Sequence, residues 1–230
     1  MSESFDTVRL YLMSRPVKRP YDSTRRQRQA KETRRRIIRA AKDLFIAQGY
    51  GQTTLVQIAE AAEVSVGTVY AAFRNKRGLL RRVWFFESRG DEDEVTLYDR
   101  TEMQAILAEP DLATRIRKHA EFVTTFNHRL APLVATVTGA AASEPGAVAM
   151  LAEWSERRID VATKYATAAA ATGQLAIGVE ECRDILYATM DGAMYQRLVS
   201  ERGWSDGRYA DWLASLWLGL FVEGSPRSLG

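Results

Sequence analysis

The chain has 230 residues, of which 46% are hydrophobic and 27% charged. A chain of this length can bury its own core, and its single cysteine, Cys182, excludes an internal disulfide. The formal net charge of +3 hides an asymmetry: residues 15–90 carry 18 Lys and Arg against 6 Asp and Glu, whereas residues 91–230 carry 13 against 21. The basic segment indicates an anionic partner.

Several classes of protein are disfavoured by what the sequence lacks. The two histidines and the cysteine, at positions 119, 128 and 182, have no metal-ligand spacing. Phosphate-loop, dinucleotide and nucleophile motifs are absent, so we expect neither an enzyme nor a cofactor. The start has no signal peptide, and the apolar stretch at 212–222 is shorter than the about 20 residues of a membrane span. A cytoplasmic protein with no membrane contact is therefore expected.

The first 24 residues show no sustained periodicity and are predicted to form a disordered arm. A helix follows, because Ile37, Ala41, Leu44 and Phe45 recur at helical spacing. Its polar side carries several Lys and Arg residues, and Gly49 is expected to end it.

Three short helices are predicted next. Thr54 and Gln57 fit a capping box at the start of one helix, and Ser65 is a good N-cap for the next, about 66–73. Asn75 can cap a further helix that runs to about residue 89. Two short helices joined by a tight turn after a longer basic helix are the layout of a helix-turn-helix, which places one helix in the DNA major groove.

The rest of the chain predicts long helices only. The acidic run 91–94 is interpreted as a solvated linker. No strand-type alternation of useful length follows, so the fold class is predicted to be all-α. The expected helices have these approximate bounds: 111–128, 132–142, 147–172, 180–202 and 206–222.

Residues 53–80 read TTLVQIAEAAEVSVGTVYAAFRNKRGLL. This closely resembles the DNA-binding domain of the TetR family of bacterial transcriptional regulators, whose pattern is roughly T-hydrophobic-x-x-I-A-x-x-A-G-V-S-x-G-T-hydrophobic-Y-x-x-F-x-x-K-x-x-L-L. Glu63 departs from the pattern, because the family usually has Gly in the turn, and Ala72 replaces a larger polar residue. After the disordered arm predicted at 1–24, the resemblance implies a helix-turn-helix domain at 25–75 and a helical ligand-binding and dimerisation domain at 76–230.

The resemblance also implies roles for residues in the basic segment. Tyr70 and Lys76 would bind backbone phosphates, and the helix N-termini at Thr54 and Ser65 also suit a phosphate. The base edges would be read by four small residues: Val66, Gly67, Thr68 and Ala71. Arg25, Arg28 and Lys31 are predicted to be part of an arm that can enter a narrow minor groove.

Two further residue sets are predicted in the C-terminal half, where residues 184–220 resemble the last two helices of a TetR subgroup. By the resemblance, the helices around a ligand cavity supply these pocket candidates: Phe122, Phe126, Met150, Trp154 and Tyr187. Apolar stripes on the last two helices predict this dimer face: Leu186, Met190, Met194, Leu213, Leu216, Trp217 and Leu220. Ordinary core packing is the alternative for both sets.

The predicted function is that of a dimeric, ligand-responsive regulator, most often a repressor in this family, on double-stranded DNA with a palindromic operator. An unknown small molecule would be its effector. Two alternatives remain open at this point. One is a constitutive DNA binder without an effector, and the other is a ligand carrier or enzyme that has lost DNA binding.

Overall fold

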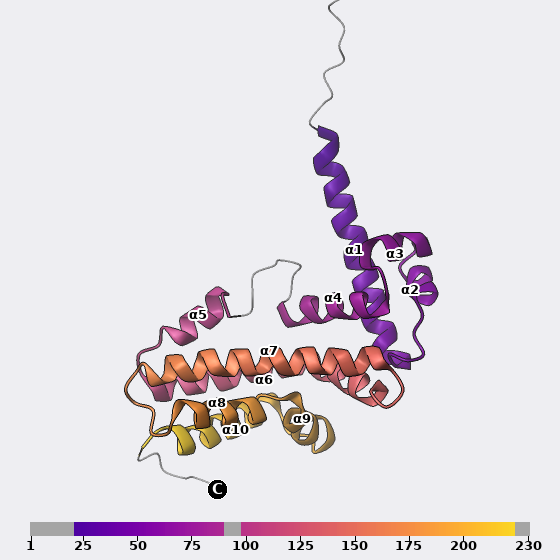
Figure 1. Ribbon diagram of the computed structural model, residues 1–230. Helices are drawn as coiled ribbons and strands as arrows, with labels where there is room; N and C mark the ends of the chain where they lie inside the picture. Colours follow the sequence, from indigo (N-terminus) through magenta and orange to yellow (C-terminus); the bar gives the residue numbers. More distant parts are fainter. Residues whose placement is uncertain (1–20, 90–97, 224–230) are drawn as a thin grey trace, which may run out of the picture. The chain divides into compact units, whose positions relative to one another are not determined.

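The computed structural model describes residues 21–89 and 98–223, and within residues 21–24 it describes the backbone only. This described part is built of helices joined by short connections and contains no strand (Figure 1), which confirms the all-α prediction. Its contacts divide the chain into two compact units, residues 1–36 and residues 37–230.

The DNA-binding layout predicted from the sequence is present in the N-terminal helices. The helix α1 spans Tyr21–Gln48, α2 spans Leu55–Ala61, α3 spans Val66–Phe73 and α4 spans Lys76–Arg89. The predicted boundary between residues 75 and 76 falls in the short connection before α4. The remaining helices are α5 (Thr101–Leu107), α6 (Leu112–Ala140), α7 (Pro145–Ala170), α8 (Val179–Thr189), α9 (Gly192–Tyr195), the π-helix η1 (Gln196–Glu201) and α10 (Asp206–Phe221).

The helix ends follow the predicted signals. Thr54 and Gln57 form the full capping box, with the Gln57 N–H 3.2 Å from Thr54 Oγ1 and the Thr54 N–H 2.8 Å from Gln57 Oε1. Ser65 Oγ accepts from the Thr68 N–H at 3.1 Å, and Asn75 Oδ1 accepts from the Gly78 N–H at 2.8 Å. The glycines expected to stop helices, at 49, 173 and 203, have φ of 91°, 71° and 72°.

Two predictions about helix continuity are wrong. The segment 111–142 is one helix, α6, with Pro132 inside it. A proline there removes one backbone hydrogen bond and costs about 3 kcal/mol, which burial of the surrounding side chains Leu130, Leu133 and Val137 offsets. The segment 180–202, expected as one helix, is divided into α8, α9 and η1. Asp191 causes the break, because its side chain accepts from the Ala193 N–H at 2.5 Å and caps a new helix.

The structure differs from the predictions in two smaller respects. The backbone of α1 begins at Tyr21, inside the segment expected to be a disordered arm. The short helix α5 has no counterpart among the predicted helices. Most of the predicted arm, residues 1–20, and the acidic run 91–94 lie outside the described residues.

Two clusters of buried side chains form the core of residues 37–230. The first joins the end of α1 and helices α2–α4 to parts of α6 and α7, and includes Phe45, Ile58, Leu80 and Met150. The second joins α5, α6 and α7 to α8 and α10, and includes Trp217. The helix α4 therefore packs between the short N-terminal helices and the long helices α6 and α7.

Candidate functional site

The helices α2 and α3 are held together by a small apolar core. Ile58 and Ala59 of α2 are buried together with Val69 and Phe73 of α3. The turn between them closes with a hydrogen bond from the Val64 N–H to the Ala59 carbonyl at 2.9 Å.

The turn has a left-handed residue. Glu63 adopts a φ of 53°, the conformation that the family pattern fills with glycine. Glu63 therefore adopts the same left-handed conformation as the usual glycine, although its side chain makes this conformation sterically unfavourable.

The outer face of α3 is exposed and free of acidic side chains. Gly67, Thr68 and Ala71 are exposed, Val66 is half-buried, and the Tyr70 side chain is 53% exposed. Thr54 and Ser65 are exposed at the starts of α2 and α3, each with its hydroxyl bound to the backbone. A helix with small side chains and one projecting tyrosine fits the width of a DNA major groove.

Lys76 occupies a position that the sequence does not predict. Its ammonium group donates to the carbonyls of Tyr50 and Gly51 at 3.0 and 3.3 Å, and lies 4.4 Å from the centre of the Tyr50 ring. The Glu144 carboxylate is 3.9 Å away, in the connection between α6 and α7. In this state Lys76 fixes the loop between α1 and α2, so a phosphate contact requires a change of its side-chain rotamer.

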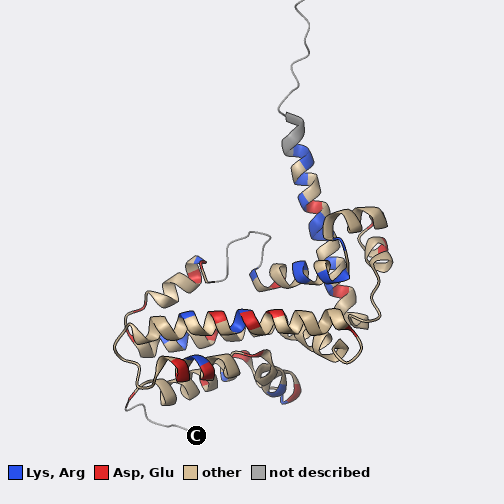
Figure 2. Cartoon of the chain, in the orientation of Figure 1, with Lys and Arg blue, Asp and Glu red and all other residues tan. Residues whose placement is uncertain are grey.

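The basic residues predicted for the arm lie on a helix. Arg25, Arg28 and Lys31 are exposed residues of α1. Figure 2 shows Lys and Arg positions along α1 and α4, and positions of both charges on α7 and α8. An α-helix is about 10 Å wide with its side chains, whereas the minor groove is about 6 Å wide. As long as this segment stays helical, its backbone does not fit a minor groove, and only its side chains can extend into one.

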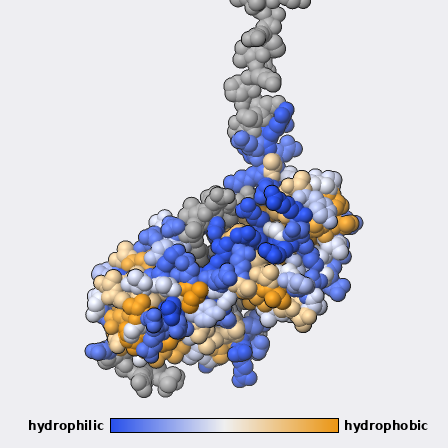
Figure 3. Space-filling view, in the orientation of Figure 1, coloured by the Kyte–Doolittle hydropathy of each residue, from blue (hydrophilic) through white to orange (hydrophobic). Residues whose placement is uncertain are grey.

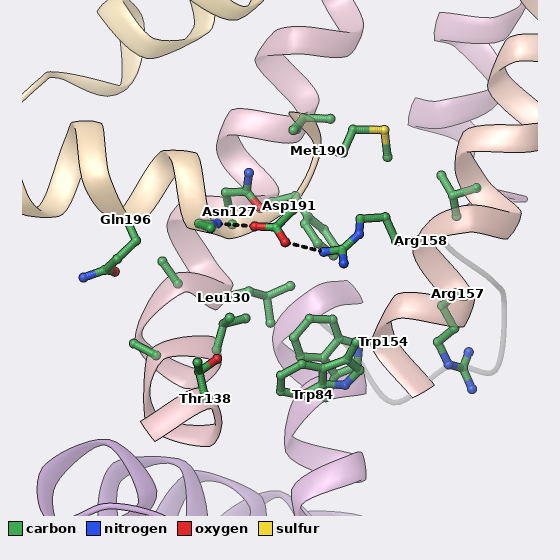
Figure 4. A pocket seen from close by; sticks show the side chains of 18 of the residues that line it. Trp84, Asn127, Leu130, Thr138, Trp154, Arg157, Arg158, Met190, Asp191 and Gln196 are labelled. Atoms are coloured by element: carbon green, nitrogen blue, oxygen red, sulfur yellow. Dashed lines mark hydrogen bonds and ion pairs between the residues drawn. The ribbon is translucent and has the colours of Figure 1, made fainter. Parts of the chain in front are cut away.

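A cavity of about 570 Å³ lies between α4, α6, α7 and the segment from Met190 to η1. One side of its wall is aromatic. Trp84 of α4 stacks on Trp154 of α7, with ring centres 3.8 Å apart at an interplanar angle of 21°. Phe126 meets Trp84 edge-on at 6.2 Å. Figure 4 shows the two indole rings overlapping on one side of the pocket.

Three polar side chains, those of Asn127, Arg158 and Asp191, lie together on the side of the pocket away from the indole rings (Figure 4). Arg158 of α7 forms an ion pair with Asp191 at 3.2 Å, the same residue that caps α9. Asn127 of α6 lies beside this corner, because its Oδ1 is 3.7 Å from where a side-chain carbon on Gly192 would stand. Arg157 is engaged by Glu153 at 3.0 Å.

A buried histidine completes the wall. His119 is 1% exposed and stacks on Tyr165, with ring centres 3.9 Å apart. Burial lowers the pKa of its imidazole to about 3, because the charged form would lose its hydration. The ring is therefore neutral at physiological pH, and it adds flat, weakly polar surface to the cavity.

The structure brings together three of the five residues predicted for the pocket. Phe122, Phe126 and Trp154 lie on the cavity wall. Met150 lies instead in the core under the N-terminal helices. The Tyr187 hydroxyl shares a hydrogen bond of 2.6 Å with Ser155 and lies outside the wall.

Sequence reasoning missed four wall residues that matter most for the chemistry of the cavity. These are Trp84, Asn127, Arg158 and Asp191. For one of them, Asn127, the sequence did contain a signal. Its spacing from Val123 and Leu130 places all three residues on one face of α6.

Three of the seven residues predicted for the dimer face are part of the chain's own core. Leu186, Leu213 and Trp217 are fully buried, and Trp217 Nε1 donates to Thr189 Oγ1 at 2.8 Å. These three side chains pack against α6 and α7 rather than facing outward. Met190, Met194 and Leu216 are half-buried, and Leu220 is 41% exposed. Figure 3 shows hydrophobic side chains at the surface in the region of α8 and α10.

Within residues 21–89 and 98–223, no helix is both long and apolar enough to cross a membrane.

Comparisons with known sequences agree on the N-terminal region. The family model described as "Bacterial regulatory proteins, tetR family" matches residues 37–83. The HTH-type transcriptional regulator TcmR of Streptomyces glaucescens is 51% identical over 51 residues, which are 22% of this chain and 23% of that protein. The uncharacterized HTH-type transcriptional regulator TtgW of Pseudomonas putida is 51% identical over 55 residues, 24% of this chain and 41% of that protein. The match thus spans less than half of the length of these relatives.

Solved structures share the fold over most of the chain. NalD, the secondary repressor of the MexAB-OprM multidrug efflux pump in Pseudomonas aeruginosa, superposes with a TM-score of 0.61 over 84% of this chain and 98% of its own, at 20% identity. The structure of a SmeT–triclosan complex has a TM-score of 0.64 over 84% of this chain and 93% of its own, also at 20% identity. Most of the chain therefore has the fold of these solved structures, and the curated relatives are named as transcriptional regulators.

Proposed function

We propose that this chain, which belongs to the tetR family of bacterial regulatory proteins, binds operator DNA through α2 and α3 and is released by a small molecule in its cavity. NalD is described as a repressor and SmeT was solved with triclosan, which supports a repressor role with a small-molecule effector here. Such a regulator would work in the cytoplasm, where its operator lies.

One observation carries the proposal: the helix that follows the DNA-binding helices also forms part of the cavity wall. The helix α4 begins at Lys76, directly after α3, and its residues Leu80 and Val83 pack in the same core as Val69 of α3. One turn after Leu80, Trp84 packs at the edge of this core, lines the cavity and stacks on Trp154. A molecule that displaces Trp84 therefore moves a helix on which the position of α3 depends.

The exposed face of α3 suits a major groove. Val66 and Ala71 can contact thymine methyl groups, and Thr68 can bond a base edge. The Tyr70 hydroxyl and a reoriented Lys76 would bind phosphates on either side. None of the base-reading residues is Arg, Asn or Gln, so we expect DNA shape to contribute much of the specificity.

A homodimer would present two copies of α3 to successive major grooves, and the operator would then be palindromic. Because three of the predicted interface residues are buried within the subunit, the surfaces left for a partner are the outer sides of α8 and α10, with Leu216 and Leu220. An effector can release such a dimer only if it binds one arrangement of the two subunits more tightly than the other.

The experiment is a fluorescence anisotropy titration with DNA from upstream of the gene itself. We expect sequence-preferring binding that weakens steeply with salt, because Lys and Arg displace counterions from the phosphates. Tyr70→Phe should weaken binding to every sequence. Tyr98→Phe should not, because Tyr98 lies outside the DNA-binding helices, shortly before α5. Equal affinity of Tyr70→Phe and the wild type would remove the role assigned to Tyr70, and binding without any sequence preference would refute the proposed function.

A further inference from the structure

We propose that the effector is a flat, uncharged aromatic molecule that carries a carbonyl or a similar hydrogen-bond acceptor on one edge. The inference rests on the proposed function, since it names the class of molecule that the cavity takes. It follows from three properties of the wall: its aromatic side, the kind of polar atoms left without partners, and the balance of its charges.

The aromatic side favours a flat molecule. Trp84, Trp154 and Phe126 form a continuous series of ring contacts, and Phe122 lies near-parallel to His119 at 6.5 Å between ring centres. These rings come from three different helices and face one cavity of about 570 Å³. A planar ring system can add face and edge contacts to these rings. A bulky aliphatic molecule would gain only from the burial of apolar surface.

The polar atoms left without partners are chiefly donors. Among the described residues, Trp154 Nε1 and Arg158 Nε are buried and have no hydrogen-bond partner. The Asn127 amide group is also buried, and the group within its reach is the Tyr209 hydroxyl. Asn127 is 4% exposed and Trp154 is 7% exposed, and both line the cavity. The two ring nitrogens of the neutral His119 are also buried without partners, and they offer one donor and one acceptor. An unpaired buried donor is costly, so a ligand that supplies acceptors is favoured over one that supplies donors.

The charges of the wall are already balanced in its polar corner. Arg158 and Asp191 neutralise each other at 3.2 Å. A cationic ligand there would meet Arg158, and an anionic ligand would meet Asp191. Arg157 is exposed and engaged by Glu153, and Arg197 and Glu201 are exposed wall residues. A cationic or an anionic group would compete with the ion pair between Arg158 and Asp191, whereas an uncharged acceptor can bind beside it.

The test compares three probes of the same ring system on the full chain by isothermal titration calorimetry. The probes are 2-acetylnaphthalene, which has a carbonyl acceptor, 2-ethylnaphthalene, which has the same shape without it, and 2-naphthylmethylammonium, which is cationic. We expect the ketone to bind about tenfold more tightly than the ethyl compound, the difference made by one hydrogen bond to a buried donor. The ammonium compound should bind most weakly.

Variants assign the effect to the donors. Asn127→Leu keeps the size of the side chain and Trp154→Phe keeps a ring, and each removes one donor. We expect at least one of them to bring the ketone and the ethyl compound to within about twofold of each other. Thr125→Val, which removes an exposed hydroxyl of α6 that does not line the cavity, should keep the full preference. Circular dichroism and thermal melting confirm that each variant is folded.

Several results would overturn the inference. Equal binding of the ketone and the ethyl compound, tightest binding of the ammonium compound, or a preference that survives in both donor variants would each do so, as would no binding of any probe. The proposed function is tested separately by the DNA titration without probe. If the chain prefers the ketone but binds no DNA, the inferred ligand class stands and the proposed regulatory function is refuted. If it binds DNA with sequence preference but shows no preference for the ketone, the proposed function stands and the inferred ligand class is refuted.

Discussion

Gly78 in the first turn of α4 is the position where a single methyl group should disturb the DNA-binding helices most. A side-chain carbon added there would stand 2.4 Å from the Phe73 carbonyl oxygen, which belongs to the last turn of α3. The obstacle is backbone, so it cannot rotate away. The neighbouring geometry is already tight, because Arg74 has a φ of 66° and the Gly78 N–H donates to Asn75.

The magnitude follows from two opposing effects. Overpacking of this kind costs about 1–3 kcal/mol, whereas replacing a glycine gains roughly 0.4–1 kcal/mol through the unfolded state. We expect Gly78→Ala to lower the free energy of unfolding by about 1–2 kcal/mol. At about 2–4 °C for each kcal/mol in a chain of this size, the melting temperature should fall by roughly 2–8 °C.

The matched control is Gly139→Ala in α6, because a side-chain carbon at Gly139 meets no atom within 4 Å. That substitution should stabilise the chain, since alanine favours helices over glycine by roughly 0.8–1 kcal/mol. Both variants are measured by urea unfolding at one protein concentration, which removes any effect of association. If Gly78→Ala is as stable as Gly139→Ala, the contact with the Phe73 carbonyl does not exist and the packing of α3 on α4 is not as described.

Three further predictions concern single interactions. Glu63→Gly should raise the free energy of unfolding by up to about 1 kcal/mol, because glycine bears no cost at a φ of 53°, and urea unfolding measures it. A drop in stability would show that the contacts of the Glu63 side chain outweigh the strain. Trp217→Phe should cost about 1–3 kcal/mol, because it leaves Thr189 without its buried donor, and Thr189→Val should recover part of that loss in the double variant; additive losses would argue against the bond. His119, whose pKa falls to about 3 by burial, should make the chain less stable as pH drops below about 6.5, the unfolded value, by about 2 kcal/mol at pH 5. His119→Phe should remove that part of the pH dependence, and unfolding curves at pH 7 and pH 5 measure it.

Local signals made the N-terminal helices predictable. The capping box at Thr54, the cap at Ser65 and the stop at Gly49 each act within four residues, and each is present in the structure. The same reasoning was wrong where distant packing overrides a local signal. Pro132 was expected to begin a helix, yet the buried residues on both sides of it keep α6 continuous.

The cavity was only partly predictable for the same physical reason. Phe122, Phe126 and Trp154 follow helical periodicity and could be proposed from the sequence, but periodicity does not separate a cavity wall from a core, as Met150 shows. Arg158 and Asp191 lie 33 positions apart, and their ion pair depends on the break after α8. No pattern within either helix indicates that the two residues meet.

The helix α4 contacts both α3, the proposed DNA-reading helix, and the cavity. Its first turn lies close to the end of α3, since a side-chain carbon at Gly78 would meet the Phe73 carbonyl oxygen, so a shift of this turn would press on the end of α3. Two turns later, Trp84 is only half-buried and faces the cavity, where a ligand can replace part of its contact with Trp154. Tight packing at one end and a replaceable contact at the other are what a helix needs to carry a displacement, because packed interfaces shift between discrete arrangements instead of deforming continuously. A variant that loosens the first turn should therefore weaken the response to a ligand even where the ligand still binds.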